Sequence, residues 1–401
     1  MKSSPTQKLH TTGKDHTFRV QTVKTLIIFL TLSIAIFLIP LQAMAGGVKA
    51  GTTPLPNTAL NSVWTITTLQ QSLDTAPLKT PPQTMSPQVN LSQIEFWTAT
   101  LPSTALNPGW TTITFQYPFD TIPLVFITAT SDGQQPSAVR IKDVTTTDFL
   151  ACQVEPPNWD GLHAPMKIHY LAISEGRHRI DEDDVIKAYH IETSAVQHGT
   201  GVEGSTGWDL LTWKDFRETP AVFAQIQTMN NEEGTPPITP SKPWLTTAMD
   251  DLTFTGGLVA LERSEAAPGQ VKMPEKIGYL AFPGNVRGTV VIGGHTINFV
   301  SVVTDPSIYG WDSDPGCYKV YLPQYFQNAP LVIASKSTRR GNDGGWLRRC
   351  SLDKDDLGLT VDEDTYLDDE RKHTREAVSI LAFSDNFHVT IPTDDVDPSC
   401  Y

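Results

Sequence analysis

The sequence predicts an all-β protein that consists of three tandem six-stranded antiparallel β-sandwiches. The chain has 30 Pro and 27 Gly in 401 residues, a composition that favours short strands and many turns. Thr, Val and Ile recur throughout, and these residues fit pleated, half-buried surfaces. One pattern of segments also recurs three times in the same order, and no segment shows convincing helical periodicity over three turns.

The beginning of the chain is typical of an exported protein. Residues 1–24 are polar and basic, Thr25–Leu41 is a continuous apolar run, and Ala43-Met44-Ala45 is a small-x-small cleavage site. We therefore predict a signal peptide at residues 1–45, with an uncleaved N-terminal anchor as the alternative. No later segment is long and apolar enough to cross a membrane, so we expect a secreted protein, in the medium, at the cell surface or in the periplasm.

The repeated pattern defines the predicted domains. A Thr/Pro-rich linker (46–91) precedes copies at residues 92–176, 185–284 and 295–386, and a C-terminal tail (387–401) follows them. In each copy a Phe stands four residues before a Pro that leads into an apolar strand: Phe119 and Pro123, Phe216 and Pro220, Phe326 and Pro330. A hairpin with two alternating halves follows, at 139–155, 244–262 and 346–363. A closing strand ends each copy, at 168–173, 277–282 and 378–383.

All four cysteines, Cys152, Cys317, Cys350 and Cys400, lie after the predicted signal peptide. An even number in an exported chain indicates disulfides, and the spacings fit no zinc motif. Four cysteines allow three pairings. We predict Cys317–Cys350, because both lie within one copy, and Cys152–Cys400 then follows by elimination.

The charge and the motifs restrict the function. The net charge of −14 argues against a nucleic-acid partner, because phosphate binding requires a basic surface. The chain contains no nucleophile elbow, zinc-protease helix, Walker loop or dinucleotide fingerprint, so we predict no enzyme. A carboxylate pair for glycoside hydrolysis stays open, since such pairs are assembled in space. We expect no cofactor; Ca²⁺ at the acidic run 361–370 is the alternative, although this run lacks EF-hand spacing.

The order of these motifs resembles the H-type lectin family, which includes snail agglutinins and discoidin C-terminal domains. The resemblance rests on Phe-x-x-x-Pro before an apolar strand, then Val-Arg-Ile, then a His followed by Tyr-Leu-Ala-Ile, and it covers about residues 92–386. The third copy is also similar to lectin-like modules of bacterial surface proteins of the MSHA-biogenesis type. The resemblance implies a six-stranded sandwich, commonly trimeric, that binds galactose or N-acetylgalactosamine glycans between neighbouring units.

The resemblance also implies which side chains contact the sugar. In copy 1 the matching residues are Asp132, Arg140, Trp159 and His163, and in copy 3 they are Asp343, Arg348 and His373. An Asp accepts hydrogen bonds from sugar hydroxyls, Arg and His donate, and Trp covers the apolar face of the ring. We expect both histidines to be solvent-accessible, because the alternation of the closing strands places them on the face opposite the apolar Ile168 and Tyr170. The alternatives are a carboxylate partner for each Arg, an ordinary loop position for each His and turn chemistry for each Asp.

Copy 2 departs from this pattern, with Ala248 at the Arg position and Lys272 at the His position.

We predict a secreted multivalent lectin or adhesin that binds glycans on cell surfaces or matrix. The first alternative is a structural or protein-interaction module of a surface or pilus-associated assembly, and the second is an enzyme or its accessory part. The copies are expected to form a pseudo-trimer within one chain, or else beads on a string or a homo-oligomer.

Overall fold

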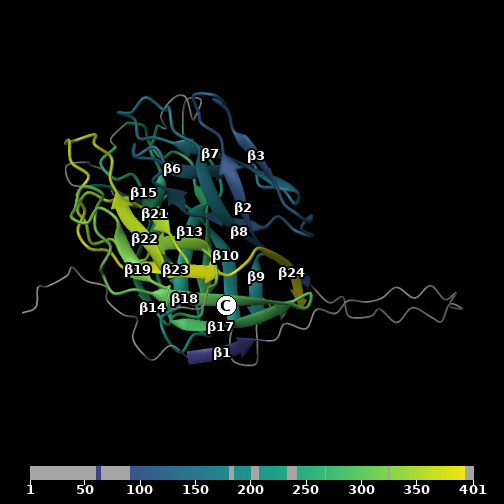
Figure 1. Ribbon diagram of the computed structural model, residues 1–401. Coiled ribbons are helices and arrows are strands. Elements are labelled where there is room, and N and C mark those ends of the chain that lie inside the picture. The colour runs from purple at the N-terminus through teal and green to yellow at the C-terminus, as the bar shows by residue number, and fades with distance from the viewer. Residues whose placement is uncertain are drawn as a thin grey trace, which may run out of the picture. The chain divides into compact units, whose positions relative to one another are not determined.

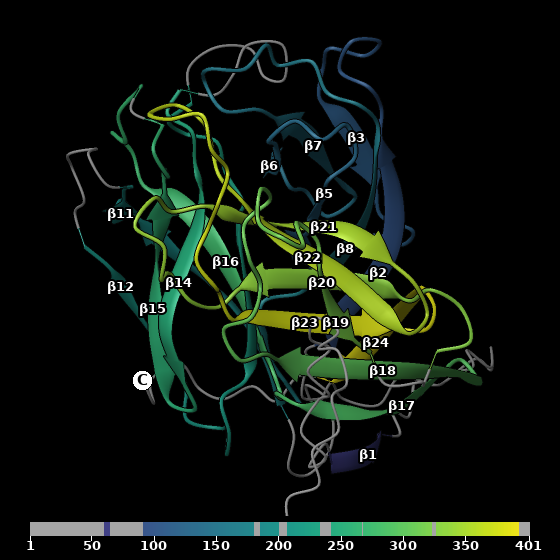
Figure 2. The same cartoon turned by 60° about the vertical axis from the view of Figure 1, so that its left-hand side comes forward.

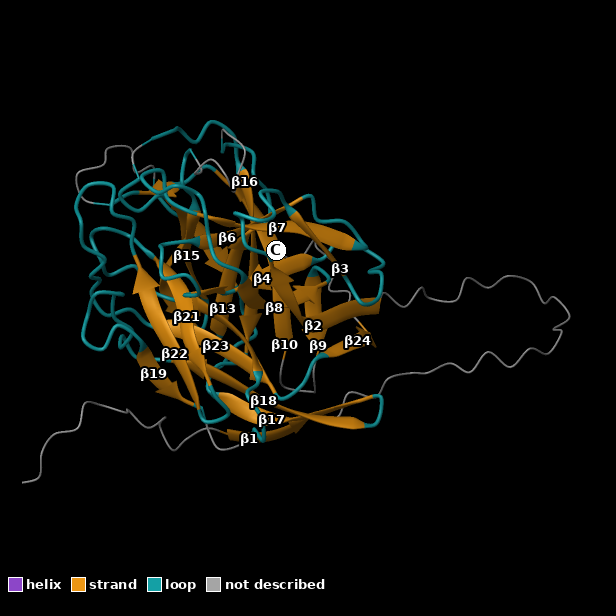
Figure 3. Ribbon diagram, turned by 45° about the horizontal axis from the view of Figure 1, so that its top comes forward, coloured by secondary structure: helices purple, strands orange, loops and turns teal. Residues whose placement is uncertain are grey.

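The computed structural model describes residues 60–64, 91–179, 185–199, 207–232, 242–266, 268–322 and 326–392. Every helix or strand within these ranges is a β-strand, which confirms the predicted all-β class (Figure 3). This part of the chain contains no helix capable of spanning a membrane. The predicted signal peptide (1–45) lies outside the described residues.

The same order of strand pairing occurs three times (Figure 1). In each copy the first strand pairs with the closing strand, which also pairs with the third strand, and together they form what we call the central sheet. The three other strands form an outer sheet. Copy 1 has β2 (Leu91–Leu101), β8 (Met166–Ile173) and β4 (Leu124–Ile127) in its central sheet, and β3 (Thr111–Thr114), β7 (Asp148–Val154) and β6 (Ala138–Lys142) in its outer sheet.

Copies 2 and 3 repeat this arrangement. The central sheet of copy 2 contains β10 (Val185–Thr193), β16 (Glu275–Phe282) and β13 (Ala221–Ile226), and its outer sheet contains β12 (Asp209–Thr212), β15 (Gly256–Glu262) and β14 (Thr246–Thr253). The central sheet of copy 3 contains β18 (His295–Val303), β23 (Val378–Phe383) and β20 (Leu331–Lys336), and its outer sheet contains β19 (Tyr318–Tyr321), β22 (Asp356–Asp362) and β21 (Trp346–Leu352). Two short strands add in parallel to outer sheets, β5 (Ala129–Thr130) to β21 and β11 (Val196–Gln197) to β15.

A seventh strand follows each closing strand and pairs with the first strand of a different copy. Strand β9 (Gly176–Arg179) pairs with β10 of copy 2, and β17 (Val286–Ile292) pairs with β18 of copy 3. Strand β24 (Phe387–Pro392) pairs with β2 of copy 1. The predicted C-terminal tail was therefore wrong for this segment, because its alternating Phe387, Val389 and Ile391 are buried in a core.

Strand β1 (Leu60–Trp64) pairs in parallel with β17, at the edge of the sheet that β17, β18, β23 and β20 form (Figure 2). The predicted linker (46–91) thus contains a strand. The other residues of this linker before Leu91 lie outside the described part of the chain.

The closing strands are apolar on both faces because both faces are buried. In β8, Ile168, Tyr170 and Ala172 face the outer sheet of copy 1, where they join that copy's own core. The alternate residues Leu171 and Ile173 belong to a central core that receives side chains from all three copies. Burial on both faces favours a nearly continuous apolar run instead of an alternating one.

The central core joins the three copies. It includes six phenylalanines from the central sheets, two from each copy: Phe96, Phe126, Phe223, Phe282, Phe299 and Phe383. Edge-to-face contacts link them across copies, with ring centroids 5.4 Å apart for Phe96 and Phe383 and 6.0 Å apart for Phe282 and Phe299. The described residues from Leu60 to Pro392 accordingly form one compact unit.

The predicted disulfide Cys317–Cys350 is present. The pairing of Cys152 with Cys400 was wrong, because Cys152 is a free, buried thiol beside Trp244 and Trp346. Cys400 itself lies outside the described residues.

Candidate functional site

The residues predicted to contact a sugar lie at the junctions between copies. Arg140, Ala248 and Arg348 occupy equivalent positions in the three hairpins, since they pair with Cys152, Ala260 and Thr360 on the neighbouring strand. Arg140 and Arg348 each face the loop that follows the third strand of another copy. The two arginines therefore contact protein groups of a neighbouring copy.

Arg140 of copy 1 binds the loop of copy 2 that follows β13. Its Nε donates to Glu232 Oε1 at 2.7 Å, and its Nη2 donates to the same oxygen and to the Thr228 carbonyl at 2.9 Å. Both charged side chains are buried, with 1% and 0% of their surface exposed. Burial raises the pKa of Glu232, although Arg140 opposes this. Arg140 Nη1 and Glu232 Oε2 have no hydrogen-bond partner within the described ranges.

Arg348 of copy 3 binds the equivalent loop of copy 1. It donates to the carbonyls of Thr130 at 3.0 Å and Gln135 at 2.7 Å, and it forms an ion pair with Asp362. Asp362 also binds Arg371, which donates to the Gln134 carbonyl at 2.9 Å.

The Trp311 ring packs against both of these guanidinium groups, with centroid distances of 5.8 Å for Arg348 and 4.9 Å for Arg371. The two arginines, Asp362 and Trp311 therefore form a clamp in which copy 3 binds the loop of copy 1.

At the junction between copies 2 and 3, the arginine lies in the loop and not in the hairpin. Copy 2 has Ala248 at the arginine position, and Arg339 in the loop of copy 3 donates to Glu262 of copy 2 at 2.5 Å. Arg339 also donates to the His198 carbonyl at 2.7 Å. Each of the three junctions thus contains a buried or largely buried arginine–carboxylate pair.

The two predicted histidines are buried, so the expectation of solvent access was wrong. His163 is 3% exposed, and its ring nitrogens contact the Ser137 hydroxyl and the Ala164 carbonyl, each at 2.9 Å. Burial lowers its pKa. His373 lies between Glu363 and Glu376 of its own copy. Burial opposes its charged form, but the hydrogen bonds that His373 donates to these carboxylates outweigh burial and raise the pKa of His373.

The remaining predicted residues lie nearer to solvent. Asp132 is exposed, and Trp159 and Asp343 are half-buried. Asp132 accepts a 2.5 Å hydrogen bond from the Thr130 hydroxyl, in the loop that Arg348 holds. Burial lowers the pKa of Arg348, and the negative charges of Asp362 and Asp132 oppose this.

At the junction between copies 1 and 3, Arg348 of copy 3 therefore holds the copy 1 loop that carries Asp132, through the carbonyls of Thr130 and Gln135. His163 binds the Ser137 hydroxyl at the end of the same loop. Next to it, Asn158 Nδ2 donates to Thr365 Oγ1 at 2.7 Å, so the loop that carries Trp159 touches the loop that carries Tyr366. Tyr366 is 39% exposed. An exposed carboxylate and two accessible aromatic rings thus lie on loops of one junction.

Burial raises the pKa of several carboxyl groups at these junctions. Burial raises the pKa of Glu155 and of Glu363 to about 7 each, and that of Asp364 to about 6. Glu265, which is 5% exposed, has its pKa raised to about 8, first by burial and then by the neighbouring acidic groups.

The acidic run 361–370 gives no calcium geometry in the part of the chain that the structure describes. Asp362 is bound by two arginines, and Asp364 accepts hydrogen bonds from the backbone NH groups of Glu265 and Tyr366. No group of three or more metal-binding side chains is found among the described residues.

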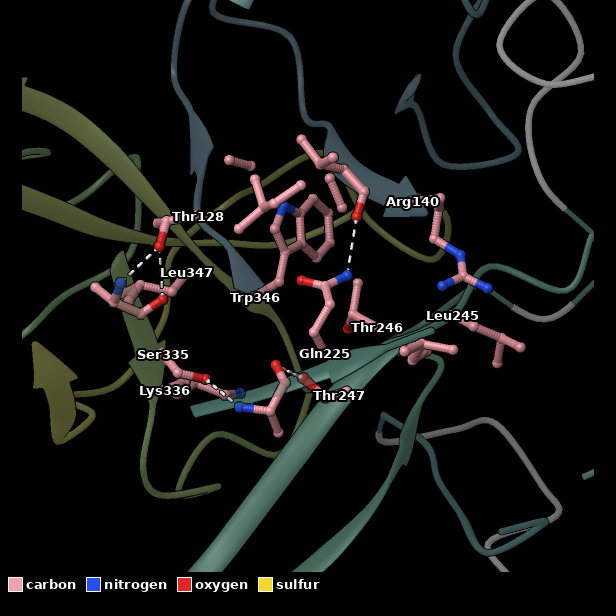
Figure 4. Close-up of a pocket in the computed structure, with 17 residues that line it drawn as sticks. Thr128, Arg140, Gln225, Leu245, Thr246, Thr247, Ser335, Lys336, Trp346 and Leu347 are labelled. Carbon is pink, nitrogen blue, oxygen red and sulfur yellow. Dashed lines mark hydrogen bonds between the residues drawn. The ribbon is translucent and has the colours of Figure 1, made fainter. Parts of the chain in front are cut away.

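A small cavity of about 70 Å³ lies where the three copies meet (Figure 4). Gln225 of β13, Ser335 of β20 and Thr128, which directly follows β4, line it together with Trp346 and Arg140. A water molecule needs about 10–15 Å³ of such space, so the cavity accommodates about five waters, whereas a hexose has about twelve non-hydrogen atoms. The cavity is therefore too small to hold a hexose.

Sequence reasoning missed the carboxylates that organise these loops. Glu275 accepts hydrogen bonds from Thr228 and from the backbone NH of Asn230, and Glu376 does the same for Thr338 and Arg340. Both glutamates stand four residues before equivalent positions of their closing strands, so their shared spacing was a usable signal.

No family model matches the chain, and neither the curated proteins nor the solved structures that were compared with it include a similar protein.

Proposed function

We propose that this chain is a secreted, non-catalytic, multivalent lectin that binds galactose or N-acetylgalactosamine-type glycans through the loops at its junctions. The observation that carries the proposal is the junction of copies 1 and 3, where Arg348 of copy 3 holds the loop that carries Asp132 and His163 binds Ser137 at the end of that loop. The resemblance to H-type lectins implies these residue types in a cleft between neighbouring units.

The burial of Arg348 and His163 assigns them a positioning role in this proposal. Asp132 and Trp159 are the accessible members, so they are the groups proposed to contact the sugar. A carboxylate accepts hydrogen bonds from two adjacent hydroxyls, and an aromatic ring covers the apolar face of a pyranose. One such site binds weakly, and repeated sites on a rigid chain increase the avidity.

A glycan array with the purified chain, with and without EDTA, tests the proposal. We expect specific signals on galactose or N-acetylgalactosamine glycans that persist in EDTA, and a loss of at least about tenfold for Asp132→Ala and for Trp159→Ala, since each removes about 1.4 kcal/mol or more. The matched control is Tyr321→Ala, which removes a partly exposed ring on β19. Equal losses in all three variants, or a silent array from folded protein, would exclude this site.

The alternative is a structural or protein-interaction module of a surface assembly, and a specific observation favours it. Arg140 and Arg348 bind protein groups of the neighbouring copy instead of facing solvent. A silent glycan array together with retention of the folded chain in a surface assembly would support this alternative.

Export is part of the proposal and has its own test. N-terminal sequencing of the protein from its native source should find a start near residue 46. An intact N-terminus would support the uncleaved anchor instead.

A further inference from the structure

The last strand of the chain is added to the first copy. The seventh strands β9 and β17 pair with first strands that directly follow them, and the turn between β17 and β18 is the tight pair Gly293-Gly294, with φ of 56° and 82°. Strand β24 is equivalent to them, but its partner β2 lies at the other end of the described repeats. Phe387 pairs with Phe96, and Ile391 pairs with Ser92.

The contacts of β24 fill both faces of the β2 edge. On one face Phe387, Val389 and Ile391 are 7%, 2% and 2% exposed, and the Phe387 ring lies 4.9 Å from that of Phe383. On the other face His388 lies 3.5 Å from Glu95. Burying side chains of this size contributes about 1.5–3 kcal/mol each, so β24 is a strongly held strand.

Without β24, the edge of β2 would present unpaired backbone groups beside an apolar core. An edge of this kind is a template for another strand. Its chemistry selects an extended segment with large apolar side chains at alternate positions, as in Phe387-His-Val-Thr-Ile391.

We propose that the β2 edge is a strand-acceptor site that β24 of a second copy of this chain can occupy, so that chains join head to tail by exchange of their last strand. The relation between copy 3 of one chain and copy 1 of the next would then be the same as that between consecutive copies within a chain. Such a head-to-tail contact closes into a ring when the rotation permits it, and exchange of an identical element requires no new interface. Closure within one chain dominates in dilute solution, because a tethered strand has an effective concentration of about 1 mM.

Paired cysteines test this proposal. Gln93 pairs with Thr390 in the ladder, so Gln93→Cys and Thr390→Cys place two thiols opposite each other. All variants also carry Cys400→Ser, which removes a competing thiol. The double variant Gln93→Cys/Thr390→Cys should form the cross-link within one chain, and this checks the pairing itself.

Exchange is measured by refolding the two single variants together at about 10 and 100 µM and separating the products on non-reducing gels. We expect a disulfide-linked dimer of the two different chains that increases with concentration. In the matched control, Thr390→Cys is replaced by Asn386→Cys, which stands before β24, and the dimer should not form.

Two results would overturn the proposal. The first is an absence of the mixed dimer at both concentrations although the double variant cross-links within one chain. The second is a failure of the double variant to cross-link, which would show that β24 does not pair with β2. Adding Val389→Asp to the Thr390→Cys chain should abolish the mixed dimer, because a charge cannot enter the apolar core.

Discussion

Removing Arg140 should destabilise the protein, and removing its partner as well should restore most of the loss. The change Arg140→Met leaves the Thr228 carbonyl and the Glu232 carboxylate buried without their donor. Each unsatisfied buried group costs about 1–3 kcal/mol, and breaking a buried ion pair costs about 3–5 kcal/mol. We therefore expect Arg140→Met to lower the free energy of unfolding by about 3–5 kcal/mol.

The double variant Arg140→Met/Glu232→Leu should be far less affected. It removes both charges together with the two groups that lack a partner, Arg140 Nη1 and Glu232 Oε2. Replacing a buried ion pair with apolar side chains of similar size is often neutral or stabilising. The expected coupling energy between the two positions is about 3 kcal/mol.

Urea unfolding followed by tryptophan fluorescence measures these free energies, since the chain has nine Trp. The single variant should also recover part of its loss as the pH is lowered, because burial raises the pKa of Glu232 and the variant lacks the guanidinium that opposes this. If the double variant is as unstable as the sum of the two single variants, the pair is not coupled and the described junction is wrong. A loss of glycan binding without a loss of stability would make Arg140 a sugar ligand.

Three further predictions concern titratable groups and thiols. Burial raises the pKa of Glu155 and of Glu363 from 4.5 to about 7, so protonation of these carboxyls favours the folded state. This contribution is complete below about pH 4.5 and is lost as the pH rises to about 8, and a melting temperature that rises between pH 5 and pH 8 would contradict this. Replacing Cys317 and Cys350 by Ser should cost about 3–4 kcal/mol, because the disulfide closes a loop with a sequence separation of 33, and the same urea assay measures it. Cys152 is a buried free thiol, and burial raises its pKa. In Cys400→Ser protein we therefore expect no thiol to react with a thiol reagent in buffer and one thiol to react in urea. Rapid labelling of the folded protein would show that Cys152 is accessible.

The strands were predictable from the sequence because their signals are local. The hairpin halves alternate with period two, and the Pro after each Phe marks the start of the third strand, so the pattern found β6, β7, β14, β15, β21 and β22. The continuous apolar character of the closing strands was also a local signal. A continuous apolar run indicates a strand that is buried on both faces, so this signal could have predicted the core that the three copies share.

The contacts between distant segments could not be predicted in this way. Strand β24 has the alternating pattern of a strand, but nothing near it identifies β2 as its partner. The histidines were misplaced because the alternation of β8 was extended to His163, which precedes the first residue of that strand, Met166. The side-chain direction of a loop residue does not follow the period of the neighbouring strand.

The absence of an arginine from copy 2 has a structural explanation in the junctions. Ala248 removes the donor that copies 1 and 3 possess at this position, and Arg339 of the facing loop provides one from the other side, to Glu262. If the position served only sugar binding, its loss in copy 2 would require no replacement. The replacement indicates that each junction requires a buried cation for its own stability. The arginines are therefore poor variants for testing the lectin proposal, whereas Asp132 and Trp159, which can be changed without breaking a buried ion pair, test it directly.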